Sequence, residues 1–315
     1  MPGRVGVVIN AFTAAEAVDR IAQAEAAGVP HAWMTTGGVG PDALTIFAAA
    51  AMRTERITLG TCIIPTWPRH PIAIAQQIVA LESFAPGRIR LGIGPSHEPS
   101  MTSMFGVQWR KPLTQLREYL QVLRALLHEG AVDFVGEHVV ARAQLAQPPR
   151  TPLLASALRP AAFEACGELA DGAISWQCPA AYLVEQALPA LARGAARAGR
   201  AVPPLMAHVP VAITTDRAAV REAAGRQVAG YSSIPFYRAM YEQAGVPQQP
   251  GAVGDELIDA LVVWGDEQQV VERLAELLRA GMGELLVMPL VTNRERDASI
   301  ERVFRAAAAA ARATA

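Results

Sequence analysis

Three stretches of the chain combine turn-forming residues with side chains that could bind a ligand or react. The first stretch reads Gly-Ile-Gly-Pro-Ser-His over residues 92–97. Because glycine has no Cβ, its glycines are expected to leave room for a ligand, into which Ser96 and His97 would project. An imidazole has an ordinary pKa of about 6.5, so His97 could supply or remove a proton near neutral pH. The alternative is that His97 is an ordinary polar loop residue.

The second stretch covers residues 59–71 and reads Leu-Gly-Thr-Cys-Ile-Ile-Pro-Thr-Trp-Pro-Arg-His-Pro. Gly60 and Thr61 permit close approach of the backbone, and Ile63 and Ile64 would present an apolar bulge at the end of a strand. The alternative is a rigid loop that has no role beyond connecting two elements.

The third stretch consists of two turns, Ala155-Ser-Ala-Leu-Arg-Pro160 and Ser175-Trp-Gln-Cys-Pro179, each placed between an expected strand and a helix expected to begin at proline. Helix N-termini offer unpaired N–H groups to anions, so the two turns predict a phosphate site, although every barrel of βα units has such turns. Apart from Glu98, the expected strand ends carry no acids. This composition favours neither a carboxylate-bound metal nor hydrolysis by paired carboxylates, and it suits a flat organic cofactor.

Eight short apolar runs alternate with longer amphipathic stretches, which is typical of repeated βα units around a parallel sheet. Strands are expected at residues 5–9, 31–35, 57–64, 88–93, 153–157, 172–176, 206–213 and 285–289. Helices are expected at residues 13–28, 41–53, 71–84, 111–128, 160–170, 179–198, 266–280 and 294–312. The segments that interrupt this order predict insertions at about residues 95–110, 131–150 and 230–263, the second of them a hairpin.

Eight units without a Gly- or Ser-rich linker predict one (β/α)8 TIM barrel over residues 1–315, with insertions after strands four and seven. An open dinucleotide-binding sheet is less favoured, because His97 stands where a G-x-G-x-x-G fingerprint needs its third glycine. Since active sites of such barrels lie at the carboxyl ends of the strands, the three stretches should meet at one mouth.

The composition excludes several classes of protein. The 315 residues include 28 Lys and Arg against 29 Asp and Glu, so there is no cationic surplus for nucleic acid. The three cysteines have no C-x-x-C spacing, which argues against a disulfide framework or a structural zinc site and predicts a cytoplasmic protein. No signal peptide and no run of about 18 apolar residues is found, so neither export nor a membrane span is expected.

The sequence resembles the luciferase-like monooxygenase superfamily, and within it the deazaflavin oxidoreductases that use coenzyme F420. The resemblance lies in residues 59–71 with Ala75-Gln-Gln after them, in Gly87-Arg-Ile-Arg-Leu-Gly-Ile-Gly-Pro-Ser-His97, and in Gly167-Glu-Leu-Ala-Asp-Gly172 before Ile-Ser-Trp176. These motifs are ordered and spaced as in the family, from the first strand to about residue 200.

The resemblance implies hydride transfer between F420 and a small organic substrate. It implies a non-proline cis peptide at Cys62-Ile63 behind the deazaflavin ring, with His97 as the group that exchanges the proton. The residues implied to bind the cofactor are Thr35, Cys62, Ile63, Gly94, Ser96, Ala155, Ser156, Ala157, Leu158, Arg159, Trp176, Gln177 and Cys178. Many relatives carry an acid or histidine after strand two, where this chain has Thr35-Thr36-Gly37, so the proton could also come from elsewhere or from water.

Alternatives remain at this stage. The same barrel could use FMN as a monooxygenase or reductase, or it could bind a cofactor or partner without catalysis. An apolar substrate is expected because the mouth would be lined by Trp67, Met101, Met104, Phe105, Trp109, Tyr231, Phe236 and Tyr237, for which ordinary loop packing is the other explanation. The resemblance also implies a homodimer.

Overall fold

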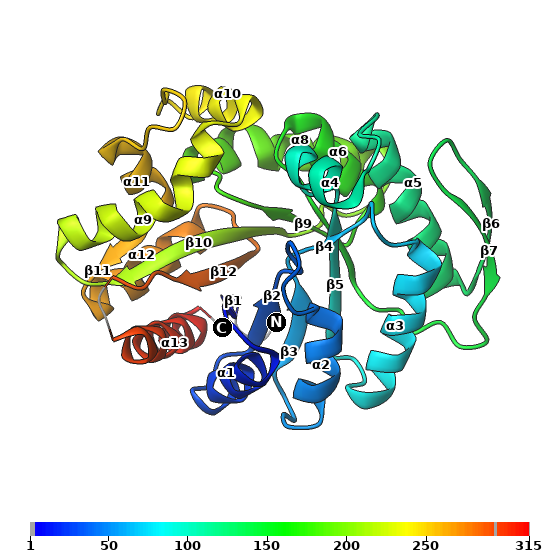
Figure 1. The fold of residues 1–315 in the computed structure, drawn as a ribbon, viewed down its shortest axis with the longest axis horizontal. Helices are drawn as coiled ribbons and strands as arrows, with labels where there is room; N and C mark the ends of the chain where they lie inside the picture. The colour runs from blue at the N-terminus through cyan, green and yellow to red at the C-terminus, as the bar shows by residue number, and fades with distance from the viewer. Residues whose placement is uncertain (1–3, 293–294, 315) are drawn as a thin grey trace.

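Eight parallel strands form a closed barrel in the computed structural model, which describes residues 4–292 and 295–314 (Figure 1). The neighbour order is β1, β2, β3, β5, β8, β9, β10 and β12, and β12 pairs with β1 to close the ring. The strands span Val5–Val8 (β1), His31–Met34 (β2), Thr58–Thr61 (β3), Ile89–Gly94 (β5), Leu153–Ser156 (β8), Gly172–Ser175 (β9), Leu205–Ile213 (β10) and Glu284–Pro289 (β12). The predicted (β/α)8 barrel is thereby confirmed.

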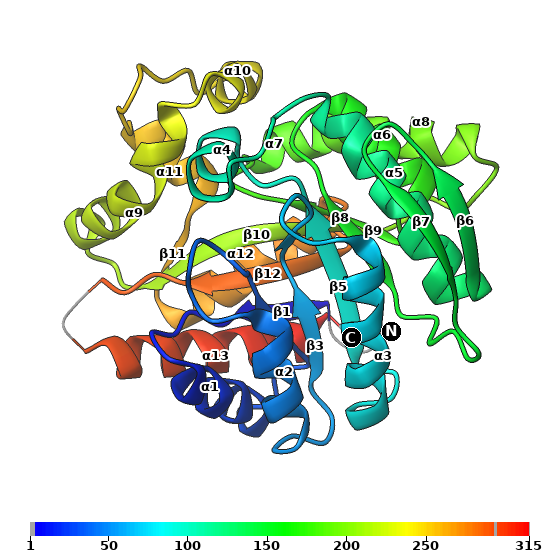
Figure 2. The ribbon, with the colours of Figure 1, turned by 45° about the vertical axis from the view of Figure 1, so that its right-hand side comes forward.

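Helices cover the outside of the barrel, as Figure 2 shows. They span Ala14–Ala26 (α1), Ala43–Ala51 (α2), Pro71–Phe84 (α3), Pro112–Arg124 (α5), Pro160–Leu169 (α6), Ala180–Tyr182 (α7), Leu188–Arg197 (α8), Glu267–Arg279 (α12) and Arg296–Ala313 (α13). Two π-helical turns, Ala125–Glu129 (η1) and Leu183–Ala187 (η2), continue α5 and join α7 to α8. The Thr13 side chain accepts the N–H of Glu16 and caps α1.

The first insertion lies between β5 and β8. It contains helix α4 (Glu98–Phe105), followed after α5 by the antiparallel hairpin of β6 (Ala131–Val135) and β7 (Val140–Gln144). The buried Glu118 carboxylate accepts the backbone N–H groups of Glu137, His138 and Val139 at 2.7–3.0 Å. This side chain therefore fixes the turn of the hairpin against α5.

The second insertion lies between β10 and β12. It consists of helices α9 (Arg217–Ser232), α10 (Pro235–Gln243) and α11 (Asp255–Leu261) and strand β11 (Val263–Gly265). β10 pairs with β9 through residues 205–207 and with β11 through residues 211–213. β12 pairs along one edge of β10. On the opposite edge, β9 pairs with the first residues of β10 and β11 pairs with the last ones.

Several sequence expectations need correction. The stretch 57–64 is broken at residues 62–63 into β3 and the short β4 (Ile64–Pro65). The insertion at 95–110 contains α4, which was not predicted, and the insertion at 230–263 ends in the unpredicted β11. The single helix expected over 179–198 is α7, η2 and α8. The last helix was expected from residue 294, which lies outside the described residues.

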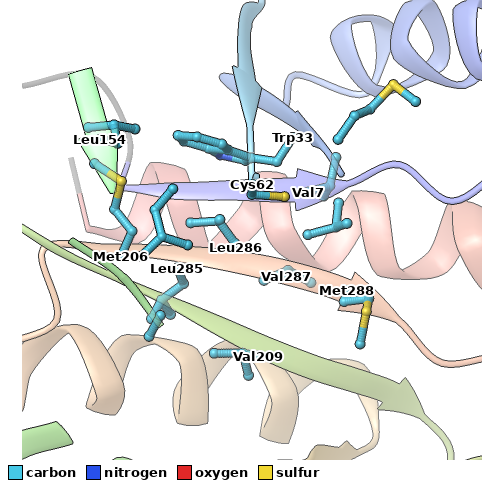
Figure 3. Close-up of a cluster of buried hydrophobic side chains, with 14 of the residues drawn as sticks. Val7, Trp33, Cys62, Leu154, Met206, Val209, Leu285, Leu286, Val287 and Met288 are labelled. Atoms are coloured by element: carbon cyan, nitrogen blue, oxygen red, sulfur yellow. The ribbon is translucent and has the colours of Figure 1, made fainter. Parts of the chain in front are cut away.

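The barrel is filled by buried side chains from opposite strands. Figure 3 shows Trp33, Met206 and Leu286 in one apolar cluster, together with neighbours from β1, β10 and β12. A Cβ at Gly60 would lie 2.4 Å from the Trp33 ring, so glycine is required where β3 passes the indole. No helix within residues 4–292 and 295–314 has the length and apolar character to cross a membrane.

Candidate active site

The expected site residues meet at the carboxyl ends of adjacent strands. Thr35 follows β2, Cys62 follows β3, Gly94 ends β5, Ser156 ends β8 and Trp176 follows β9. Because β2, β3, β5, β8 and β9 are successive neighbours in the ring, these positions form one continuous arc of the mouth.

The peptide bond between Cys62 and Ile63 is cis, as the resemblance implied. The Thr35 hydroxyl donates to the Cys62 carbonyl oxygen at 2.6 Å, and the Thr36 N–H donates to the Ile63 carbonyl oxygen at 3.1 Å. The end of β2 therefore fixes the bulge from one side. Burial raises the pKa of the Cys62 thiol to about 12, so the thiol stays protonated and is no nucleophile near neutral pH.

The glycines of β5 serve a different purpose from the one expected. A Cβ at Gly94 would lie 2.0 Å from the Ser156 Oγ and 3.4 Å from the Ile63 Cδ1. A Cβ at Gly92 would lie 2.0 Å from the carbonyl oxygen of Thr61. Protein atoms thus fill the space that was expected to admit a ligand. What these glycines allow is close packing of β5 against its neighbours, which brings Ser156 beside Ile63.

His97 lies at the start of α4 and contacts the second insertion. Its Nε2 is 3.1 Å from the Tyr237 hydroxyl, and its ring centroid is 5.6 Å from that of Tyr231. The Tyr231 ring also meets Trp176, with 5.8 Å between centroids. Burial lowers the pKa of His97, so its imidazole is neutral at pH 7. The preceding residue, Ser96, has a left-handed backbone with φ 62° that directs the chain into α4.

The expected apolar lining falls into two groups around the mouth. Tyr231, Phe236 and Tyr237 form one aromatic cluster on the side of the second insertion, in which the Tyr237 ring centroid lies 4.9 Å from that of Tyr231 and 5.3 Å from that of Phe236. Trp67 and Trp109 form another pair, with 5.2 Å between centroids.

Helix α4 adds methionine and phenylalanine side chains to this lining. Met101 is buried, whereas Met104 and Phe105 are each 44% exposed. The Met104 Cε would be 3.8 Å from a Cβ at Gly38, so α4 reaches the loop after β2. This unpredicted helix therefore lies across one part of the mouth.

The turn after β8 leads directly into α6. Ala155 is buried within β8, and the Ala157 N–H donates to the Ile174 carbonyl oxygen at 2.9 Å. The Leu158 carbonyl oxygen accepts the Tyr182 hydroxyl at 2.9 Å. Arg159 is exposed at the N-cap position of α6 and makes no side-chain cap. No hydrogen bond or ion pair of its guanidinium is found within residues 4–292 and 295–314, so it can meet an anion at the first turn of this ten-residue helix.

The turn after β9 holds an amide without partners. Gln177 has a left-handed φ of 53°, and both polar atoms of its side chain are buried without a hydrogen bond among the described residues. A buried amide in this state costs free energy until a polar group reaches it. The Cys178 thiol donates to the Trp176 carbonyl oxygen at 3.4 Å, and burial raises its pKa to about 12. The thiol therefore stays protonated and is no nucleophile near neutral pH.

Sequence reasoning missed His208, which lies on β10 with its ring edge-on to Trp176 at 4.8 Å. Its Nδ1 is 2.7 Å from the Ser175 carbonyl oxygen and must carry the proton, because a carbonyl only accepts. Its Nε2 is buried without a partner among the described residues, and burial lowers the pKa of the ring to about 4. A histidine within the apolar run 206–213 is the signal that could have found it.

A cavity of about 220 Å³ opens beyond the ends of β1 and β12 and was also missed. Its lining includes Asn10, Phe12, Arg20 and Arg296. Arg296 donates to the Asn10 carbonyl oxygen at 2.9 Å, and its guanidinium lies 4.5 Å from the centroid of the Phe12 ring. The residues come from opposite ends of the chain, so no local motif joins them.

A barrel of parallel strands with a bulge, a histidine and aromatic side chains at its mouth defines the class of (β/α)8-barrel enzymes. Residues 2–284 match the luciferase-like monooxygenase family. The chain belongs to this family, which confirms the resemblance found in the sequence.

Individual relatives extend this comparison. The chain is 30% identical over 272 residues to the F420-dependent glucose-6-phosphate dehydrogenase of Nakamurella multipartita, covering 81% of this chain and 78% of the relative. It is 26% identical over 296 residues to the 5,10-methylenetetrahydromethanopterin reductase of Methanolobus tindarius, covering 87% and 90%. The coenzyme F420 dependent tetrahydromethanopterin reductase of Methanopyrus kandleri superposes with a TM-score of 0.79 at 23% identity, covering 97% of this chain and 98% of that one, and so has the same fold.

Proposed function

We propose that this chain binds the deazaflavin coenzyme F420 at the barrel mouth and transfers a hydride between it and a small apolar organic substrate. The observation that carries the proposal is the bulge at Cys62 and Ile63, which Thr35 holds within the arc of strand ends. Oxidoreductases among the relatives, named for F420, support the choice of cofactor. Residues 1–315 are proposed to form a single luciferase-like barrel domain with its two insertions.

The residues at the mouth fit such a cofactor. Ile63 offers a half-buried apolar side chain for a planar ring, while Thr35, Ser96 and Ser156 are exposed or half-buried hydroxyls around it. The unpartnered Gln177 amide is a polar group at the turn where a phosphate is expected. Leu158 is half-buried and would contribute apolar surface along the same arc, whereas Gly94, Ala155 and Ala157 are buried and would shape the arc from beneath.

The Arg159 guanidinium at the start of α6 would hold the cofactor's phosphate, and the backbone of residues 176–178 would line its other side. When bound, F420 supplies a two-electron hydride donor or acceptor. The chain's own contribution is to orient the substrate against that ring, to exclude water through the aromatic cluster, and to exchange the accompanying proton at His97.

Titration with F420 and with FMN, followed by tryptophan fluorescence, tests the cofactor. We expect F420 to bind at least tenfold more tightly than FMN. Gln177→Ala should weaken F420 binding about tenfold, whereas Gln268→Ala, an exposed amide on α12, should leave it unchanged. Tighter binding of FMN would replace the proposal with an FMN-dependent enzyme.

Turnover with reduced F420 across ketones, aldehydes, imines and activated alkenes, and with oxidised F420 across alcohols, tests catalysis. We expect at least one class to react, and His97→Gln to lower its turnover about 100-fold, as loss of a general acid or base does. Binding of F420 without any turnover would instead identify a non-catalytic barrel. A homodimer located in the cytoplasm is the further expectation, which light scattering and fractionation would examine.

A further inference from the structure

The contact between His97 and Tyr237 joins the barrel to the second insertion across 140 positions of the sequence. Tyr237 is only 3% exposed, and its ring is held by Tyr231, Phe236 and Tyr241 at centroid distances of 4.9, 5.3 and 6.2 Å. A phenol packed on several sides has one position for its hydroxyl oxygen. The 3.1 Å distance to the His97 Nε2 is therefore a property of the packed insertion.

Burial also determines the protonation of both groups. It raises the pKa of Tyr237 well above its ordinary value, so the hydroxyl keeps its proton, and it lowers the pKa of His97, so the imidazole carries a single proton. Because burial disfavours a tyrosinate at this position and the hydroxyl lies 3.1 Å from the His97 Nε2, the role left to Tyr237 is to orient His97.

Two arrangements of the hydrogen bond are conceivable. If Nε2–H donated to the Tyr237 oxygen, the buried O–H would lack an acceptor, since no other hydrogen bond to this hydroxyl is found among the described residues. If the O–H donates to a bare Nε2, both groups are satisfied. The second arrangement is favoured, and it leaves the proton of the neutral imidazole on Nδ1.

We propose that Tyr237 is a positioning residue that holds His97 in the tautomer protonated on Nδ1, so that the imidazole offers a hydrogen-bond donor to the oxygen of a carbonyl substrate or the nitrogen of an imine. This inference rests on the proposed function and narrows its substrate class. A neutral imidazole that donates from Nδ1 polarises an acceptor atom at the reacting centre. An unactivated alkene offers no such atom.

The tautomer can be read directly from the protein without cofactor or substrate. Histidine labelled with ¹⁵N at both ring nitrogens gives signals for six residues, and those of His97 are identified by their absence in His97→Gln. At pH 7.5 we expect His97 to be protonated at Nδ1 and bare at Nε2. Protonation at Nε2 in the unsubstituted protein would overturn the proposal, and the His97→Gln variant serves only to assign the signals.

The variant Tyr237→Phe removes the hydroxyl and keeps the ring. We expect it to redistribute the proton of His97 between both nitrogens. Tyr231→Phe is the matched control, because Tyr231 packs against the same imidazole without a hydrogen bond to it, and its spectrum should keep the unsubstituted pattern. An unchanged tautomer in Tyr237→Phe, or an equal change in both variants, would overturn the proposal.

Turnover supplies a second measurement. Tyr237→Phe should lower kcat for a carbonyl or imine substrate about tenfold while the KM for F420 stays within twofold. Alkenes turned over faster than carbonyls and imines by the unsubstituted enzyme would contradict the substrate class. Failure of F420 to bind would refute the proposed function and leave the tautomer result standing, whereas the wrong tautomer in an enzyme active with F420 would refute only this inference.

Discussion

The charged pair Arg90 and Glu284 lies inside the barrel at the amino-terminal ends of β5 and β12, opposite the mouth. The Arg90 Nη1 is 2.6 Å from the Glu284 Oε2, and the Trp33 Nε1 donates to the Oε1 at 3.0 Å. The Arg90 guanidinium also lies 4.7 Å from the centroid of the Trp33 ring. The Arg90 and Glu284 side chains are 17% and 8% exposed, so little water reaches either charge. Each charge is therefore stabilised by its partner and not by hydration.

The expected effect of a substitution follows from this burial. Glu284→Leu leaves the Arg90 guanidinium without a carboxylate, and Arg90→Met leaves the Glu284 carboxylate without a cation. Each should lower the free energy of unfolding by about 3–5 kcal/mol. The double variant removes both charges and leaves only the Trp33 N–H without an acceptor, which costs about 1–3 kcal/mol. It should therefore be at least about 2 kcal/mol more stable than the sum of the single losses predicts.

Urea denaturation followed by circular dichroism measures all four proteins. With a slope of about 3 kcal/mol/M, each single variant should unfold at about 1 M lower urea or more. Below their unfolding temperatures the variants should bind F420 with unchanged affinity, because the pair lies at the far end of the barrel. Single losses under about 1 kcal/mol, or additive losses in the double variant, would refute the account of a mutually dependent buried pair.

Other regions give further expectations. Burial lowers the pKa of His208 from 6.5 to about 4, so the unfolded state takes up a proton at a higher pH than the folded state does. The contribution of His208 to the free energy of unfolding is therefore full above pH 6.5 and falls by about 3 kcal/mol as the pH is lowered to 4. Urea midpoints measured across this pH range should lose that dependence in His208→Gln. Gly92→Ala places a Cβ 2.0 Å from a carbonyl oxygen of β3 and should lower the free energy of unfolding by about 1–3 kcal/mol. Gly225 in α9 faces open space, so Gly225→Ala should not destabilise the protein. Equal losses in the two variants would contradict the explanation by steric overlap. Glu118→Gln weakens the acceptor of the three N–H groups at residues 137–139. Hydrogen exchange of these amides should accelerate at least tenfold, while the amides of β5 stay protected. Unchanged exchange would show that the hairpin turn is stable without the carboxylate.

The sequence predicted the barrel well because its strands are buried on both faces. Runs such as residues 153–157 and 206–213 are apolar and short, and each is followed by a helix with a recognisable cap or first-turn proline. The predicted bounds of α3, residues 71–84, are those observed, because proline begins the helix at its first turn.

Some elements were missed because contacts between residues distant in sequence define them. Others were missed because their local sequence is typical of a loop. Residues 95–110 contain prolines and a glycine typical of a loop, yet Pro99 lies in the first turn of α4, where proline is tolerated. Strand β11 has three residues, which is too few to show alternation of apolar and polar side chains, and it is defined by its pairing with β10. The contact of Tyr237 with His97 depends on how the second insertion folds back, which no local pattern encodes.

Strand β10 has nine residues, whereas its neighbour β9 has four, so the last part of one edge extends past the ring. An uncovered parallel edge of this kind would offer free backbone groups to another chain and invite aggregation. β11 occupies that edge through residues 211–213. The second insertion thus covers an edge of the barrel sheet as well as supplying aromatic residues at the mouth. Deleting β11 would leave residues 211–213 of β10 open to pairing with another chain.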